Sequence, residues 1–111
     1  MNKAANAFFD DKAKSLASIS KVLGHPARVT LLKYLQGNDH QTVKSLVEQL
    51  PFTQSTVSQH LYMLRSVGLV ETKPHKTATI YSISHDRIAS YKKALEEVLG
   101  KQKDKKQMSL F

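Results

Sequence analysis

Apolar residues at helical spacing predict the first helix of the chain. They fall at i, i+4, i+8 and i+11, and they are Ala5, Phe9, Ala13 and Leu16. This period predicts one amphipathic helix that runs towards Leu23 and ends at Gly24. Pro26 suits the first turn of a second helix, which lasts until Gly37. The inward stripe of that helix consists of Val29, Leu32 and Leu35.

A third helix is predicted after a turn at residues 38–41. Thr42 is a residue type that caps helix N-termini, and Pro51 discourages continuation beyond about two turns. The apolar positions of this helix are Val43, Leu46, Val47 and Leu50. Phe52 is expected to fill the turn that follows.

A fourth helix begins at a Thr53 cap and has an apolar inner face and a small polar outer face. The inner face consists of Val57, Leu61 and Leu64, at i, i+4 and i+7. The outer face consists of Gln54, Ser55, Ser58, Gln59 and Tyr62. Such groups can meet base edges and phosphates, so the division predicts a DNA-recognition helix. Gly68 is expected to close the helix in the left-handed conformation and to place Leu69 against Leu64.

From Leu69 onward the helical period is replaced by strand-type residues. Residues 69–73 and 77–83 are rich in Thr, Val, Ile and Tyr, and residues 74–76 separate them, which predicts a β-hairpin. A last helix is predicted from about Asp86 until Gly100. Its apolar positions are Ile88, Tyr91, Leu95, Val98 and Leu99.

These elements predict a mainly α (α+β) fold, a winged helix-turn-helix with about five helices and one β-hairpin. Residues 1–100 are expected to form a single DNA-binding and dimerisation domain. The two terminal helices carry more apolar surface than a core of this size needs, and a twofold dimer would bury that surface. Residues 101–111 form a basic segment without an apolar period, which predicts a disordered tail.

Composition limits the classes of function. Seventeen Lys and Arg against nine Asp and Glu give a net charge of +8 and a pI near 9.8, which favours nucleic acid or an anionic membrane surface as a partner. The lack of cysteine excludes disulfides, thiolate metal ligands and cysteine catalysis. No apolar run approaches the roughly 20 residues of a membrane span, and Asp10 and Asp11 interrupt any signal-type segment, so we expect a soluble cytoplasmic protein.

Three motifs resemble the ArsR/SmtB family of bacterial winged-helix regulators. They are residues 23–28 (Leu-Gly-His-Pro-Ala-Arg), residues 55–61 (Ser-Thr-Val-Ser-Gln-His-Leu) and residues 64–70 (Leu-Arg-Ser-Val-Gly-Leu-Val), with residues 81–83 (Tyr-Ser-Ile) as a strand end. The resemblance covers the chain from about Ser15 to Leu99. It implies a homodimer joined through the N- and C-terminal helices that binds an imperfect inverted repeat in promoters, usually as a repressor released by an inducer. Two recognition helices would then reach major grooves about 34 Å apart.

The sequence differs from this family in its sensing residues. Arsenic, cadmium and lead sensors of the family carry a Cys-x-Cys pair where this chain has residues 42–44 (Thr-Val-Lys). Zinc sensors of the family use Asp, His and Glu ligands, for which this chain offers Ser84, His85, Asp86, Glu96 and Glu97. The five histidines are 10 to 20 residues apart, so no two form a chelating pair on one helix face. We therefore expect no metal ligands and no cofactor, the alternative being a cation held by Asp86 and Glu97 near His85.

The expected DNA contacts divide between the fourth helix and the tip of the hairpin. The full set is Thr53, Gln54, Ser55, Thr56, Ser58, Gln59, His60, Tyr62, Arg65, Lys73, His75 and Lys76. No Asp or Glu occurs between Glu48 and Glu71, although the first turn of a helix normally favours acids. This exclusion fits a surface that phosphates approach.

Each group in this set has a plainer alternative. The helix face would otherwise be an ordinary solvated surface, and the basic hairpin tip a charged loop. The hairpin could instead act as a wing that contacts phosphates or the minor groove, and such a wing needs a basic cluster like that of Lys73, His75 and Lys76. His60 is expected either to pack inside the protein or to contact a phosphate. Tyr62 and Arg65 either contact the DNA backbone or belong to an ordinary solvent-exposed surface. Arg28 is expected to be a structural charge or to position a phosphate.

Four widely spaced glycines form no phosphate-binding loop, and no serine lies in a Gly-x-Ser-x-Gly turn, so we expect no enzyme. Three other functions remain open at this point. The first hypothesis is a homodimeric, sequence-specific regulator of transcription that binds double-stranded DNA, more often a repressor. The second is a metal- or small-molecule-responsive repressor with a ligand site at the dimer interface. The third is a protein-interaction module without a DNA function.

Overall fold

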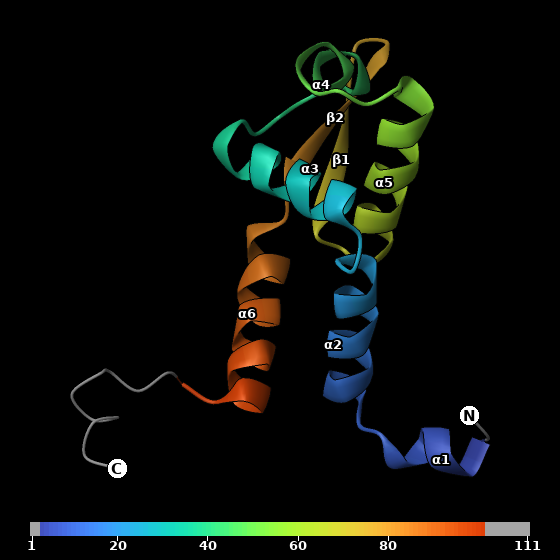
Figure 1. Ribbon diagram of the computed structural model, residues 1–111, viewed down its shortest axis with the longest axis vertical. Helices are drawn as coiled ribbons and strands as arrows, with labels where there is room; N and C mark the ends of the chain where they lie inside the picture. The colour runs from blue at the N-terminus through green and yellow to red at the C-terminus, as the bar shows by residue number, and fades with distance from the viewer. Residues whose placement is uncertain (1–2, 102–111) are drawn as a thin grey trace.

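The structure, a computed structural model, describes residues 3–101 as six helices and one two-stranded antiparallel sheet (Figure 1). The helices are α1 (Lys3–Phe8), α2 (Asp11–Val22), α3 (Pro26–Gly37), α4 (Val43–Gln49), α5 (Gln54–Ser66) and α6 (His85–Leu99), and the strands are β1 (Val70–His75) and β2 (Ala78–Ile83). This order confirms the predicted mainly α winged helix-turn-helix. The predicted tail lies outside the described residues except for Lys101.

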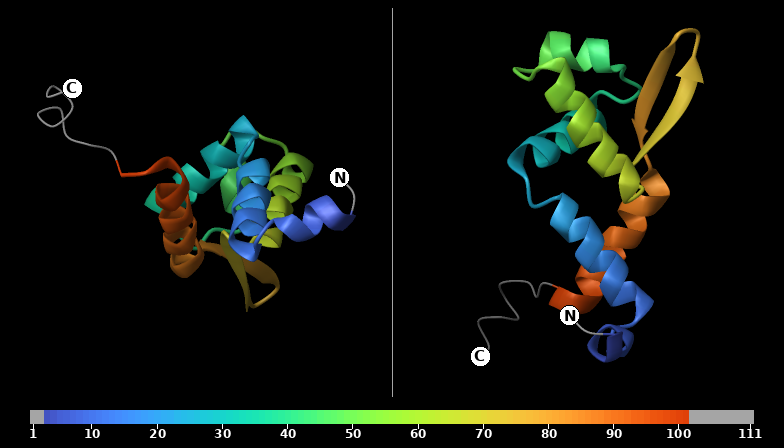
Figure 2. Two further views of the ribbon diagram at one scale, coloured as in Figure 1. Left: turned by 90° about the horizontal axis from the view of Figure 1, so that it is seen from below. Right: turned by 90° about the vertical axis from the view of Figure 1, so that its right-hand side faces the viewer.

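The elements form a head and two projecting helices. Helices α3, α4 and α5 and the hairpin make up the head, and α2 and α6 extend side by side away from it (Figures 1 and 2). Helix α1 lies at the far end of α2. The molecule is therefore elongated, with extents of 55 × 44 × 23 Å.

The prediction of one continuous N-terminal helix is wrong, because the chain breaks at Asp10. The side chain of Asp10 caps α2 by accepting a hydrogen bond from the amide of Ala13 at 2.7 Å. A cap residue takes an extended backbone, with ψ of 167° here, and so it separates two helices. Phe8 and Phe9 on the α1 side are 85% and 39% exposed instead of continuing an inward stripe.

The core lies where α3, α4, α5 and the base of the hairpin meet. Its fully buried side chains come from all four elements and are Leu31, Leu35, Leu46, Val57, Leu61, Leu64, Leu69 and Val70. Ile19, Val22 and Ile83 extend this cluster towards α2 and α6, and Phe52 packs against it in the turn between α4 and α5. The predicted inner face of α5 is confirmed, because all three of its apolar residues are buried.

Helix α5 ends in the hydrogen-bond pattern of a Schellman motif. Gly68 has φ of +80°, its amide donates to the carbonyl of Arg65 at 2.9 Å, and the amide of Leu69 donates to the carbonyl of Leu64 at 3.1 Å. Leu64 and Leu69 are both fully buried. The predicted left-handed glycine and its apolar pair are thus confirmed, and they turn the chain directly into β1.

The turn of the hairpin is tighter than predicted. Pro74 and His75 belong to β1, where they pair with Thr79 and Ala78, so the turn contracts to residues 76 and 77. Lys76 takes a left-handed backbone with φ of +56°, as a tight two-residue hairpin turn requires. Proline is tolerated because β1 is an edge strand.

Candidate nucleic-acid interface

The outer face of α5 carries polar side chains that are open to solvent. The exposed members of the predicted set on this helix are Gln54, Ser55, Ser58, Gln59, Tyr62 and Arg65. Tyr62 is 70% exposed. Because the buried residues of α5 hold the opposite side against the core, these groups project outward from a rigid support.

The N-terminus of α5 is capped by its own side chains. The amide of Thr56 donates to Oγ1 of Thr53 at 3.3 Å, and the Thr53 hydroxyl donates to Oγ1 of Thr56 at 2.9 Å. Thr56 is half-buried, so it belongs to this cap more than to the outward surface. Lys44 of α4 lines a hollow together with Gln54, Val47 and Glu48. Sequence reasoning missed this basic residue, although α4 contains no other lysine or arginine.

The side chain of His60 faces inward, which fits the packed alternative of the prediction and not a contact with DNA. Its side chain is 8% exposed, and its Nδ1 accepts a hydrogen bond from Nε of Arg28 at 3.2 Å. The ring of His25 lies 4.5 Å from that of His60 between centroids. Arg28 also donates to the carbonyl of Val22 at 3.2 Å. This cluster joins α5 to α3 and to the end of α2.

The surroundings of His60 oppose a positive charge on its ring. Burial lowers the pKa of His60 from its ordinary value of 6.5, and the neighbouring His25 and Arg28 lower it further. A neutral ring is also required for Nδ1 to accept from Arg28. His60 is therefore a structural histidine that holds the recognition helix against α3.

The predicted basic residues of the wing lie at its exposed end. Lys73, His75 and Lys76 are all exposed, whereas the base of the hairpin is buried through Val70 and Ile83. The N-terminal end of α5 and the wing tip reach the same end of the molecule, opposite to α1 (Figures 1 and 2). The structure thus brings the two predicted contact regions to one surface.

Comparison with known proteins agrees with this arrangement. Residues 25–72 match the family model described as bacterial regulatory protein, arsR family. An uncharacterized HTH-type transcriptional regulator of Methanocaldococcus jannaschii is 32% identical over 88 residues, covering 79% of this chain and 99% of that protein. A biofilm growth-associated repressor of Agrobacterium fabrum is 33% identical, covering 78% of this chain and 73% of the relative.

A solved structure shares the fold. It is the solution structure of a homodimeric winged helix-turn-helix DNA-binding domain from Mycobacterium bovis, described as a possible ArsR-family transcriptional regulator. It superposes with a TM-score of 0.65 at 27% identity, covering 82% of this chain and 85% of that one.

The fold, the exposed polar face of α5 and these relatives define the class: a DNA-binding transcriptional regulator of the winged helix-turn-helix type, and not an enzyme. Within that class, the chain belongs to the arsR family of bacterial regulatory proteins. Over residues 3–101, no helix is long and apolar enough to cross a membrane. In the same part of the chain, no group of three or more His, Asp or Glu side chains could hold a metal ion.

Proposed function

We propose that the chain represses transcription by binding an inverted-repeat operator as a homodimer, with α5 in the major groove and the wing on the flanking backbone. The single observation that carries this proposal is the outward face of α5, on which uncharged hydrogen-bonding side chains project and which itself carries no acidic residue. Glutamine can bond adenine in a bidentate manner, and serine can donate or accept at a base edge. A repressor name among the relatives supports the direction of regulation.

The specific contacts are assigned to Gln54, Ser55, Ser58 and Gln59, which are uncharged and exposed. Thr53, Tyr62 and Arg65 are assigned to the phosphate backbone, which positions a protein on DNA without reading sequence. The basic wing residues Lys73, His75 and Lys76 add further backbone affinity. We add Lys44 to this backbone set, because it lies beside Gln54 at the start of the recognition helix.

The proposed dimer forms through α2 and α6. None of the fifteen residues of α6, all of which the structure describes, is buried in the single chain. Its apolar residues nevertheless fall at helical spacing, and Val98 and Leu99 are 67% and 77% exposed. Burying such an amphipathic face against a second copy would stabilise it. The homodimeric description of the M. bovis domain supports the same assembly.

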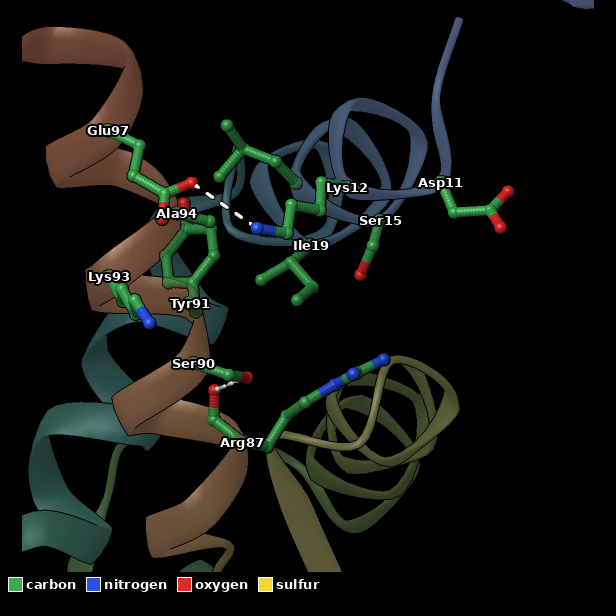
Figure 3. A pocket seen from close by; sticks show the side chains of 11 residues that line it. Asp11, Lys12, Ser15, Ile19, Arg87, Ser90, Tyr91, Lys93, Ala94 and Glu97 are labelled. Atoms are coloured by element: carbon green, nitrogen blue, oxygen red, sulfur yellow. Dashed lines mark hydrogen bonds and ion pairs between the residues drawn. The ribbon is translucent and has the colours of Figure 1, made fainter.

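Helices α2 and α6 of one chain leave a hollow between them (Figure 3). Ile19 and Tyr91 line it, Lys12 and Glu97 form an ion pair across it at 3.9 Å, and Ser20 is hydrogen-bonded to Tyr91 at 3.0 Å. The hydrogen bond and the packing of Ile19 and Tyr91 connect the two helices, whereas the ion pair contributes little because its side chains are largely exposed. The proposed interface would therefore join two preformed helix pairs.

The role of α5 is tested with the variant Gln59→Ala. Duplexes retained from a random-sequence library would first define the operator, and fluorescence anisotropy would then give affinities for this operator and for a scrambled duplex. Loss of one bidentate base contact should cost about 1 to 3 kcal/mol on the operator only. The matched control is Gln36→Ala, which removes an exposed glutamine from α3. Equal losses on both duplexes would refute the assignment of Gln59 to base reading.

A second candidate function is a repressor that responds to a metal ion or a small molecule. The observation in its favour is the hollow between α2 and α6, with a volume of about 340 Å³, which lies beside the proposed dimer interface. Operator affinity measured with Zn²⁺, Ni²⁺, Co²⁺ and Mn²⁺, and with a chelator, tests the metal version of this function. Unchanged affinity under all five conditions would exclude control by these metals.

A further inference from the structure

The loop between α3 and α4 is hydrogen-bonded to the second strand of the wing. Oδ1 of Asp39 accepts a hydrogen bond from the amide of Ile83 at 3.0 Å. Two residues further on, Gln41 and Tyr81 exchange a pair of backbone hydrogen bonds at 2.9 and 2.7 Å. The wing strand β2 is therefore attached to this loop at two points near its base.

The same loop is tied to the start of α4. The side chain of Gln41 accepts a hydrogen bond from Oγ of Ser45 at 2.7 Å. Ser45 in turn forms the capping box of α4 with Thr42, in which the amide of each residue donates to the side-chain oxygen of the other at 3.0 Å. A continuous chain of hydrogen bonds thus runs from the wing through the loop to the first helix of the helix-turn-helix.

Asp39 also shapes the loop itself. Its Oδ1 accepts from the amide of His40 at 3.0 Å, and His40 has a left-handed backbone with φ of +61°. Non-glycine residues adopt this conformation at a cost that surrounding contacts must offset. Asp39 is half-buried, so its two amide bonds are partly shielded from water. His40 and His85 lie 4.0 and 3.9 Å from Oδ2, but both rings are more than 70% exposed and contribute little.

A two-stranded hairpin needs such support. An isolated hairpin is marginally stable, and here only its base is buried while its basic tip is exposed. The direction of the tip is consequently set by the contacts at the base. A small rotation there would move Lys76 relative to α5.

We propose that Asp39 is a positioning residue for DNA binding, which fixes the angle between the wing and the helix-turn-helix so that the wing lysines meet the backbone while α5 occupies the groove. Its Oδ1 acceptor performs this role, and its charge is not required. The effect on DNA binding rests on the proposed function, whereas the effect on the wing angle does not.

The angle is tested first in the free protein. Because the chain has no cysteine, the variants Thr77→Cys and Gln49→Cys place spin labels on the wing and on α4 without background labelling. The labelled chain is diluted with unlabelled chain so that each dimer carries one label pair. Asp39→Ala should broaden the label-to-label distance distribution, whereas Asp39→Asn, which keeps the oxygen acceptor, should leave it narrow.

The matched control is Asp86→Ala, which removes the same charge from the same surface hollow. A distribution in Asp39→Ala as narrow as that of the control would overturn the proposal, and so would equal broadening in Asp39→Asn. If Asp39→Ala does not fold, Gln41→Ala replaces it. That variant keeps the backbone pair with Tyr81 but loses the bond to Ser45, so it should broaden the distribution by a smaller amount.

The consequence for DNA is tested by combining Asp39→Ala with Lys76→Ala. In the parent protein, Lys76→Ala should lower the slope of log affinity against log salt by about one. In the Asp39→Ala background the same substitution should lower it by less than half as much. Equal slope changes in both backgrounds would refute the positioning role. No slope change in the parent would instead refute the proposed wing contact, and the label distances would still decide the role of Asp39 in the wing angle.

Discussion

Replacing Gly68 with alanine should destabilise the fold through the turn that joins the recognition helix to the wing. The backbone of Gly68 has φ of +80°, where a residue with a Cβ costs about 1 to 2 kcal/mol. The added Cβ would also lie 3.2 Å from Nε of Arg87, and that nitrogen donates to the carbonyl of Val67 at 2.9 Å. Displacing this bond adds up to about 1 kcal/mol. The expected loss is therefore about 1 to 3 kcal/mol in the free energy of unfolding.

Urea unfolding followed by circular dichroism measures this loss. Both proteins must be compared at one chain concentration, because dissociation of a dimer would make the midpoint depend on concentration. The slope of the transition should stay unchanged, since the same surface is exposed on unfolding. A lower midpoint with the parent slope is the expected result for Gly68→Ala.

A second glycine supplies the control. At Gly37, at the end of α3, no described atom outside the adjoining helix backbone and the two neighbouring residues lies within 4 Å of an added Cβ. Alanine is favoured over glycine in helices by up to about 1 kcal/mol, so Gly37→Ala should be neutral or stabilising. The two glycine-to-alanine changes should thus act in opposite directions. If Gly68→Ala unfolds at the same urea concentration as Gly37→Ala, the argument from the left-handed backbone is refuted.

Two further predictions concern the buried histidine and the proposed dimer. Because the pKa of His60 is lowered in the folded state, the unfolded chain binds a proton there first, and stability should fall as the pH drops below about 6.5. Between pH 7 and pH 5, the urea midpoint of His60→Gln should depend less on pH than that of the parent protein, whereas the exposed His75→Gln should keep the parent's dependence. The same pH dependence in the parent and in His60→Gln would contradict the assigned pKa direction. Val98→Asp should place an unpaired charge in the proposed interface and shift sedimentation equilibrium towards monomer, with Lys92→Asp as the exposed control. An undiminished dimer in Val98→Asp would place the interface elsewhere.

The amino-acid sequence by itself determined the parts of the structure that depend on near neighbours. The caps at Thr42 and Thr53 and the turn at Gly68 form hydrogen bonds to residues no more than five positions away. The residue types at these positions therefore predict the caps and the turn. The apolar period of α5 likewise predicts its buried face, and the remaining positions then form the polar outer face. The assignment of that face to DNA reading remains a prediction.

Only the tertiary structure decided which side chains meet across long stretches of the chain. Arg28 and His60 are 32 positions apart, and Asp39 and Ile83 are 44 apart. No local pattern encodes such pairs, because they depend on how packed helices bring separate segments together. From the sequence His60 could therefore be assigned to DNA contact beside the exposed Gln59, yet its ring packs against α3. The sequence determined which elements form, whereas the packing of α3 and its following loop decided how the recognition helix and the wing are held.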